Sequence, residues 1–132
     1  MDIDLSVERI QVASAGLLYL SEGDYPFEVI ALDANPVSLE AQLRELAGKQ
    51  KDASVEVVTL EWFFRNMVKL AANASLEQNG RAERFIRLQQ VLQEELSEIA
   101  VYLIGEVEIA AFVIGRLSNG TFSGLRTKVI QT

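Results

Sequence analysis

The chain has 132 residues, with 12 Lys and Arg against 19 Asp and Glu, and it contains neither His nor Cys. This length predicts a single domain over residues 1–132. The missing Cys excludes disulfides, thiol nucleophiles and zinc ribbons, and the missing His excludes a Ser-His-Asp triad and imidazole metal ligands. A net charge of −7 argues against direct binding to nucleic acid or to an anionic membrane surface.

The negative charge is unevenly distributed along the chain. Residues 1–66 contain 12 acidic and 5 basic residues, whereas residues 67–132 contain 7 of each. Such an excess commonly keeps a protein soluble, and it also suits a surface that attracts a basic partner. The acidic N-terminus lacks the pattern of a secretory signal, and the longest uncharged run, residues 10–21, is too short to span a membrane. A cytoplasmic location is therefore expected.

The first half of the chain alternates between helical and strand patterns. Residues 27–32 are nearly all apolar and predict a strand that is buried on both faces. The apolar face of the first predicted helix includes Leu5, Ile10, Ala13 and Leu17. In order, we expect this helix, a turn at 21–26, the strand at 27–32, a short helix at 38–48, a strand at 55–59 and an aromatic-rich helix around 62–64.

The second half begins with one long helix and ends in strands. Residues 73–80 predict a loop, although Ser75 and Gln78 could form a capping box that opens the helix. Its apolar residues recur at spacings of three and four, with charges between them: Phe85, Leu88, Val91, Leu92, Leu96 and Ile99. Residues 101–115 are then β-rich, 118–121 form a strong hairpin turn, and 122–130 run back. These elements predict the α/β class, with a mixed sheet covered by helices and a C-terminal β-hairpin.

Carboxylates suggest two candidate sites. Glu22, Asp24 and Glu28 could supply a general acid and base for sugar chemistry, although loop carboxylates beside Gly and Pro are more often simply exposed. Glu106 and Glu108 stand two apart in a predicted strand and therefore on one face, where they could bind a divalent ion weakly. A strand that faces solvent explains this second pair equally well.

Aromatic residues suggest a third candidate. Trp62, Phe63 and Phe64 could form a binding platform. Consecutive aromatics on a helix usually divide between core and surface, however, because they point in different directions. None of these three signals is specific to one function.

Two stretches resemble a known family. Residues 17–29 read Leu-Leu-x-x-Ser-Glu-x-x-Tyr-Pro-Phe-Glu-Val, and residues 13–29 as a whole resemble the N-terminal signature of the nuclease A inhibitor family. Residues 101–115 and 124–132 look like the C-terminal hairpin of that family. Chain length and segment order also agree, so the resemblance covers the whole chain. It implies a three-layer α/β/α sandwich of the pathogenesis-related-protein-1 type, and a protein without catalysis of its own.

The resemblance also implies a partner and a mode of binding. The partner would be a sugar-non-specific DNA/RNA endonuclease of the ββα-metal class. Glu22 would enter its active site in place of the scissile phosphate, and Thr132 would reach its catalytic magnesium. The chain itself would need no cofactor, because the magnesium belongs to the nuclease. The residues expected to shape the inserting turn are Ser21, Gly23, Asp24 and Tyr25.

One segment departs from the family pattern. Family members use an acidic, Trp-containing loop between the middle helices as a second contact, whereas residues 70–80 contain no aromatic residue and Trp62 does not align with that contact. This departure leaves one alternative open, and the carboxylates near Glu22 leave a second. The chain could be an acidic binding module that has lost nuclease inhibition and binds another basic protein, or an enzyme that uses Glu22 with Asp24 or Glu28.

Overall fold

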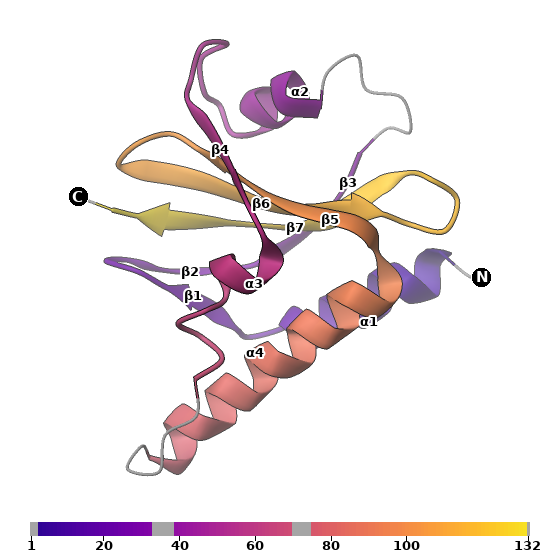
Figure 1. Ribbon diagram of the computed structural model, residues 1–132, viewed down its shortest axis with the longest axis vertical. Coiled ribbons are helices and arrows are strands. Elements are labelled where there is room, and N and C mark those ends of the chain that lie inside the picture. Colours follow the sequence, from indigo (N-terminus) through magenta and orange to yellow (C-terminus); the bar gives the residue numbers. More distant parts are fainter. Residues whose placement is uncertain (1–2, 33–38, 70–74, 132) are drawn as a thin grey trace.

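The computed structural model describes residues 3–32, 39–69 and 75–131 (Figure 1). Three features of the sequence analysis lie outside these residues. They are the predicted start of the short helix at Ser38, residues 70–74 of the segment 70–80, and Thr132. The elements are α1 (Ile3–Ser14), β1 (Leu18–Leu20), β2 (Asp24–Pro26), β3 (Glu28–Leu32), α2 (Leu39–Leu46), β4 (Val55–Val58), α3 (Leu60–Phe63), α4 (Leu76–Glu95), β5 (Ser97–Ile104), β6 (Glu108–Arg116) and β7 (Phe122–Ile130).

Five strands form one sheet in the order β3-β7-β6-β5-β4, and β1 and β2 form a separate hairpin. Every strand pairing among the described residues is antiparallel, so the prediction of a mixed sheet is wrong. The interleaved helices suggested crossovers between adjacent parallel strands. Instead, β3 and β4, which flank α2 in sequence, join opposite edges of the sheet. The α/β class and the C-terminal hairpin of β6 and β7 are confirmed.

Strand β3 is an edge strand rather than a strand buried on both faces. Glu28 and Ala31 are exposed, whereas Leu32 is buried. The apolar run alone predicted a central position, but the sheet order places β3 beside β7 at one edge. An edge position leaves part of an apolar strand facing solvent.

Helices pack against both faces of the sheet. Along β6, Ala111 and Val113 belong to an apolar cluster with α1, α3 and α4, and Phe112 and Ile114 belong to another with α2. Successive side chains of a strand point to opposite faces. Figure 1 accordingly shows α2 on one side of the sheet and α1 and α4 on the other. The three-layer sandwich of the pathogenesis-related-protein-1 type stays a prediction.

Helix α4 begins at Leu76, so the prediction of a loop is wrong for residues 76–80 and the alternative of a capping box at Ser75 is confirmed. Ser75 Oγ accepts a hydrogen bond from Gln78 N (3.1 Å), and Gln78 Oε1 accepts one from Ser75 N (3.0 Å). The helix ends at Glu95, earlier than expected, and Ile99 lies in β5. The pairing of β5 with β6 shifts register between Ser97 and Ala100, so the first residues of this strand lack a regular period of two. The predicted apolar residues Phe85, Leu88, Val91, Leu92 and Leu96 are buried.

Helix α1 packs beside α4. Arg9 Nη2 pairs with the Glu94 carboxylate at 2.8 Å, and Arg9 Nη1 also bonds Glu95. Ile10 is buried as expected, but Leu5 is 53% exposed and does not belong to the buried face. Within the described part of the chain, no helix combines the length and apolar character needed to cross a bilayer.

Candidate functional site

The turn that joins β1 to β2 carries the predicted site residues. Its hydrogen bonds are local in part: the Ser21 hydroxyl donates to Gly23 O (2.7 Å), and Ser21 N donates to the same oxygen (3.3 Å). The side chain of Glu22 is exposed, and so is that of Asp24 at the start of β2. The turn therefore presents Glu22 outward from a closed backbone loop.

The same turn is also bonded to the end of β7. Ile130 N donates to Ser21 Oγ (3.0 Å), and Glu22 N donates to Ile130 O (3.3 Å). The Ser21 hydroxyl thus accepts from β7 while it donates within the turn. Figure 1 shows the β1–β2 turn and the end of β7 on the same side of the molecule. These bonds fix the backbone of Glu22 relative to the sheet.

Close packing around Gly23 adds to this attachment. A Cβ at this position would lie 2.9 Å from the ring of Tyr25 and 3.2 Å from the side chain of Ile130. Farther along β2, Thr127 Oγ1 donates to Pro26 O (2.9 Å) and contacts Tyr25 O (3.2 Å). The hairpin is therefore fastened to β7 at two points.

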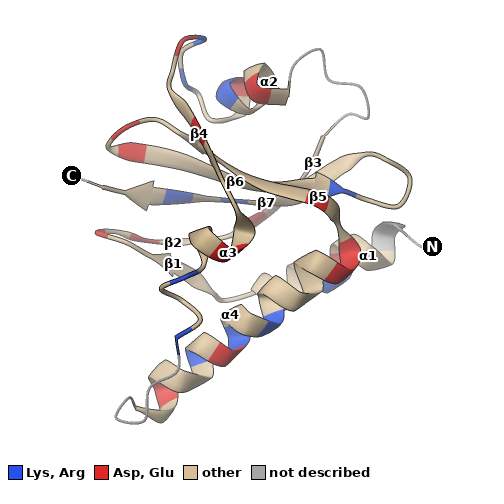
Figure 2. Cartoon of the chain, viewed as in Figure 1, with Lys and Arg blue, Asp and Glu red and all other residues tan. Residues whose placement is uncertain are grey.

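A second turn meets this end of the molecule. Gln131 N donates to Val107 O (2.9 Å), which joins the chain after β7 to the turn between β5 and β6. Glu106 lies in that turn and not in a strand, so the prediction that Glu106 and Glu108 share one strand face is wrong. Acidic residues mark both turns on the side of the C-terminus in Figure 2.

Glu108 opens β6 and pairs with Lys128 Nζ at 2.9 Å. The hydrogen bond from Lys128 and its positive charge hold the pKa of Glu108 below its ordinary value and raise the pKa of Lys128. Among the described residues, no group of three or more acidic side chains is arranged to hold a metal ion. The weak ion site considered at this pair therefore has no third ligand in the described chain.

Glu28 is separated from the turn. Its carboxylate accepts from Arg126 Nε at 2.9 Å, across the pairing of β3 with β7. Glu22 is bonded to Ile130, four residues farther along β7, which corresponds to about 13 Å of strand. The structure thus pairs Glu28 with a cation and not with Glu22, which disfavours an acid–base pair of these two carboxylates.

A groove of about 510 Å³ opens beside Glu22, and Gln131 and Trp62 also line it. The three predicted platform aromatics divide as expected between core and surface. Phe63 and Phe64 are buried, whereas Trp62 is 44% exposed. Only the tryptophan is available on this side, so these residues form no three-ring platform.

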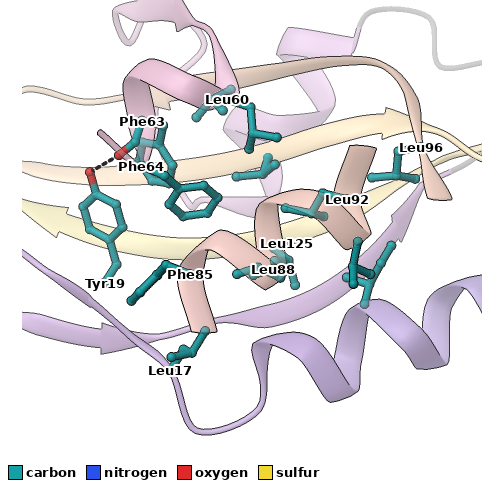
Figure 3. Close-up of a cluster of buried hydrophobic side chains, with 14 of the residues drawn as sticks. Leu17, Tyr19, Leu60, Phe63, Phe64, Phe85, Leu88, Leu92, Leu96 and Leu125 are labelled. Atoms are coloured by element: carbon teal, nitrogen blue, oxygen red, sulfur yellow. Dashed lines mark hydrogen bonds between the residues drawn. The ribbon is translucent and has the colours of Figure 1, made fainter. Parts of the chain in front are cut away.

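Tyr19 connects the hairpin to the wall of this groove. Its hydroxyl donates to Phe63 O (2.8 Å), and its ring stacks on that of Phe63 at 4.3 Å between centroids (Figure 3). Burial raises the pKa of the Tyr19 hydroxyl, and the nearby charge of Arg65 opposes this rise. The hydroxyl therefore stays protonated and keeps its role as donor.

Comparison with known proteins assigns the chain to a family. The family model for nuclease A inhibitor-like proteins matches residues 5–132, nearly the whole chain. The chain belongs to the nuclease A inhibitor-like family. No curated protein matches the chain. Membership in the nuclease A inhibitor-like family indicates a nuclease as partner and an inhibitory role.

The structure brings together most of the residues that the family resemblance named. Ser21, Glu22 and Gly23 form one turn, and Asp24 and Tyr25 continue it as β2. Thr132 lies outside the described residues, but Gln131 lines the groove that also contacts Glu22.

Sequence reasoning missed three contacts around the candidate site of this nuclease A inhibitor-like protein. These are the bonds from Ile130 to the turn, the bond from Tyr19 to Phe63, and the contact of Arg65 with Trp62. The first two join residues 109 and 44 positions apart, and no local pattern marks such pairs. The third had a usable signal, because a cation three residues after a tryptophan lies on the same side of a helical turn.

Proposed function

We propose that this chain is a protein inhibitor of a sugar-non-specific, magnesium-dependent endonuclease of the ββα-metal class, without catalysis of its own. Glu22 would enter the nuclease active site in place of the scissile phosphate. One observation carries the proposal: the turn that exposes Glu22 is bonded through Ser21 and its own backbone to Ile130 of the central sheet. We also propose that the fold is a three-layer α/β/α sandwich of the pathogenesis-related-protein-1 type.

The rigid turn suits competitive inhibition. A nuclease of this class has a basic cleft built for a phosphodiester anion, and a carboxylate supplies a similar charge without a bond that can be cleaved. A flexible loop would lose conformational entropy when it binds, and that loss would weaken binding. Because Glu22 is already held against β7, most of this loss is avoided.

Thr132 would complete the contact by binding the magnesium of the nuclease. Mg²⁺ prefers oxygen ligands, and a terminal threonine offers both a hydroxyl and a carboxylate. Gln131, the preceding residue, is bonded to Val107 and lines the groove beside Glu22. This placement supports a joint approach of Glu22 and Thr132 to one active site.

The charge of the chain supports an approach to a basic enzyme. The net charge is −7, and acidic residues occupy both turns at this end of the molecule (Figure 2). Opposite charges accelerate encounter, and the effect falls as ionic strength rises. The same charge disfavours nucleic acid and anionic membranes as direct partners.

The test is an inhibition titration against a ββα-metal endonuclease with wild-type protein and Glu22→Gln. We expect stoichiometric inhibition by the wild type and an inhibition constant at least about 30-fold higher for the variant, since loss of one member of a buried charge pair costs about 2–5 kcal/mol. Glu83→Gln is the matched control, because it removes the same charge from an exposed position on α4, outside residues 70–80 and outside the groove. Equal inhibition by Glu22→Gln and the wild type would exclude the phosphate-replacing role. No inhibition by the wild type would favour an acidic module for another basic partner.

A tail of Gly and Ser residues added after Thr132 tests the metal contact. We expect the tail to weaken inhibition at least about tenfold, because it moves the carboxylate away from the metal and crowds the cleft. The same tail placed before Met1 is the control. Normal inhibition by the protein with the C-terminal tail would rule out ligation of magnesium by the terminus.

A further inference from the structure

Trp62 and Arg65 form a paired surface feature beside the proposed site. The Arg65 guanidinium carbon lies 3.5 Å from the centre of the Trp62 ring, and Arg65 Nη1 donates to Trp62 O (2.7 Å). Both side chains line the groove that Glu22 and Gln131 also line. A single exposed tryptophan is unremarkable in a soluble protein. This one carries a stacked cation and shares a groove with the inserting turn, which points to a contact surface.

The pair and the turn belong to one rigid frame. Trp62 N donates to Thr59 Oγ1 (3.1 Å), which caps the short helix α3. The next residue, Phe63, accepts the hydrogen bond from Tyr19, and Tyr19 stands three residues before Glu22 in the hairpin. A partner seated on Glu22 would therefore meet the Trp62–Arg65 pair without rearrangement of either element.

The chemistry of the pair defines what it can accept. An indole supplies apolar area at small cost in conformational entropy, and tryptophan and arginine are frequent energetic centres of interfaces. A guanidinium stacked over an aromatic ring keeps its N–H groups in its own plane, directed toward its edges, where they suit a carboxylate. Glu22 and Arg65 thus present opposite charges along one groove. A uniformly basic partner surface would be repelled by Arg65, whereas a basic cleft with an acidic residue at its rim would fit both charges.

We propose that the Trp62–Arg65 pair is a second contact for the nuclease, and this inference rests on the proposed function. The indole would pack on an apolar patch at the rim of the basic cleft, and the guanidinium would bind a carboxylate there. The pair would thereby select among nucleases whose clefts all accept Glu22.

The experiment measures the dissociation constant for a sugar-non-specific, magnesium-dependent ββα-metal endonuclease by calorimetry. Trp62→Ala is compared with Val12→Ala, which removes an apolar side chain that is 67% exposed on α1 and outside the groove. Arg65→Glu is compared with Arg87→Glu on α4, which changes the net charge by the same amount at a residue outside the groove. We expect Trp62→Ala and Arg65→Glu each to raise the dissociation constant at least about tenfold, and both controls to stay within about twofold of the wild type.

The outcomes separate this inference from the proposed function. If Glu22→Gln weakens binding but Trp62→Ala and Arg65→Glu do not, the pair is no contact and the phosphate-replacing role stands. If both pair variants weaken binding while Glu22→Gln does not, the surface is supported and the role of Glu22 is wrong. If the wild type does not bind, both proposals fail. Thermal unfolding of each variant checks that the fold is intact. If Trp62→Ala unfolds, Arg65→Glu still tests the inference, because it alters an exposed side chain and leaves no cavity.

Discussion

Strand β7 begins at one turn and ends beside another, and the two turns are held by different contacts. The turn before β7 is stabilised by its own residues. Leu117 N donates to Thr121 O (2.8 Å), and Asn119 Oδ1 accepts from both the amide (3.0 Å) and the hydroxyl (2.7 Å) of Thr121. Gly120 has a φ of 87°, a conformation that favours glycine. All these bonds join residues within five positions of one another.

The turn at Glu22 has local bonds from Ser21 to Gly23 O, but it also depends on distant residues. The bond from Ile130 N to Ser21 Oγ joins positions 109 residues apart, and the bond from Glu22 N to Ile130 O has a similar span. The bonds to Ile130 can form only when β7 is in place, so the position of the turn relative to the sheet depends on the folding of the sheet. A turn made to present a charge to a partner gains from that dependence, because the sheet and not the turn then sets the position of Glu22.

Replacing Ser21 should expose this difference most strongly. Ser21→Ala removes the acceptor for Ile130 N, so we expect a loss of about 1–3 kcal/mol in the free energy of unfolding, measured by denaturant titration. We also expect inhibition to weaken about tenfold, because Glu22 loses its attachment to β7.

Ser123→Ala is the matched control for that experiment. The Ser123 hydroxyl lies in the same strand and donates to Ile30 O (2.8 Å), away from the Glu22 turn. It should lower stability by a similar amount and leave inhibition intact. Inhibition that falls equally in both variants would mean that the loss follows general stability and not the position of Glu22.

Asn119 offers the converse test at the local turn. Asn119→Ala removes the side-chain acceptor for Thr121, and we expect a cost of about 1 kcal/mol in the free energy of unfolding without a change in inhibition. Asn119→Asp keeps an acceptor oxygen and should retain most of the stability. A loss of inhibition in Asn119→Ala would show that the two ends of β7 are not independent.

The same contrast explains what could be predicted from the sequence. The turn at 118–121 and the buried stripe of α4 depend on residues close in sequence, and both were predicted. The capping box at Ser75 is also local, and the sequence indicated it as an alternative to a loop. The antiparallel sheet was not predicted, because an apolar strand such as β3 does not reveal which edge it joins. Leu5 was misassigned for a similar reason, since a helical stripe does not show how far the partner helix extends.

The candidate site was predictable by resemblance but not by local pattern. The Ser-Glu turn stands out in residues 17–29 as a family signature, and it names Glu22 directly. Its attachment to Ile130 and the stacking of Arg65 on Trp62 depend on where β7 and α3 end in space. Those positions follow from packing of the whole sheet and helix layer, which no short segment encodes.

The smallest expected effect concerns the ion pair of Glu108 and Lys128 near the Glu22 turn. The pKa of Glu108 is lowered by the hydrogen bond and the charge of Lys128, so the pair stabilises the fold at pH values above the ordinary 4.5 of Glu108. This contribution is lost as pH falls through the lowered pKa. Because the pKa of Lys128 is raised, the contribution is also lost at alkaline pH, as pH rises through a value above the ordinary 10.5.

We therefore expect Glu108→Gln to unfold at a slightly lower temperature than the wild type at neutral pH, and the difference to shrink as pH falls below about 4.5. Thermal unfolding followed by circular dichroism from pH 7 to pH 3 measures this. Both side chains are exposed, so water and salt screen the pair and the effect stays small. A difference that persists unchanged at pH 3 would assign the loss to packing of the Glu108 side chain. The pair would then be part of the local structure of β6 and not an electrostatic link between β6 and β7.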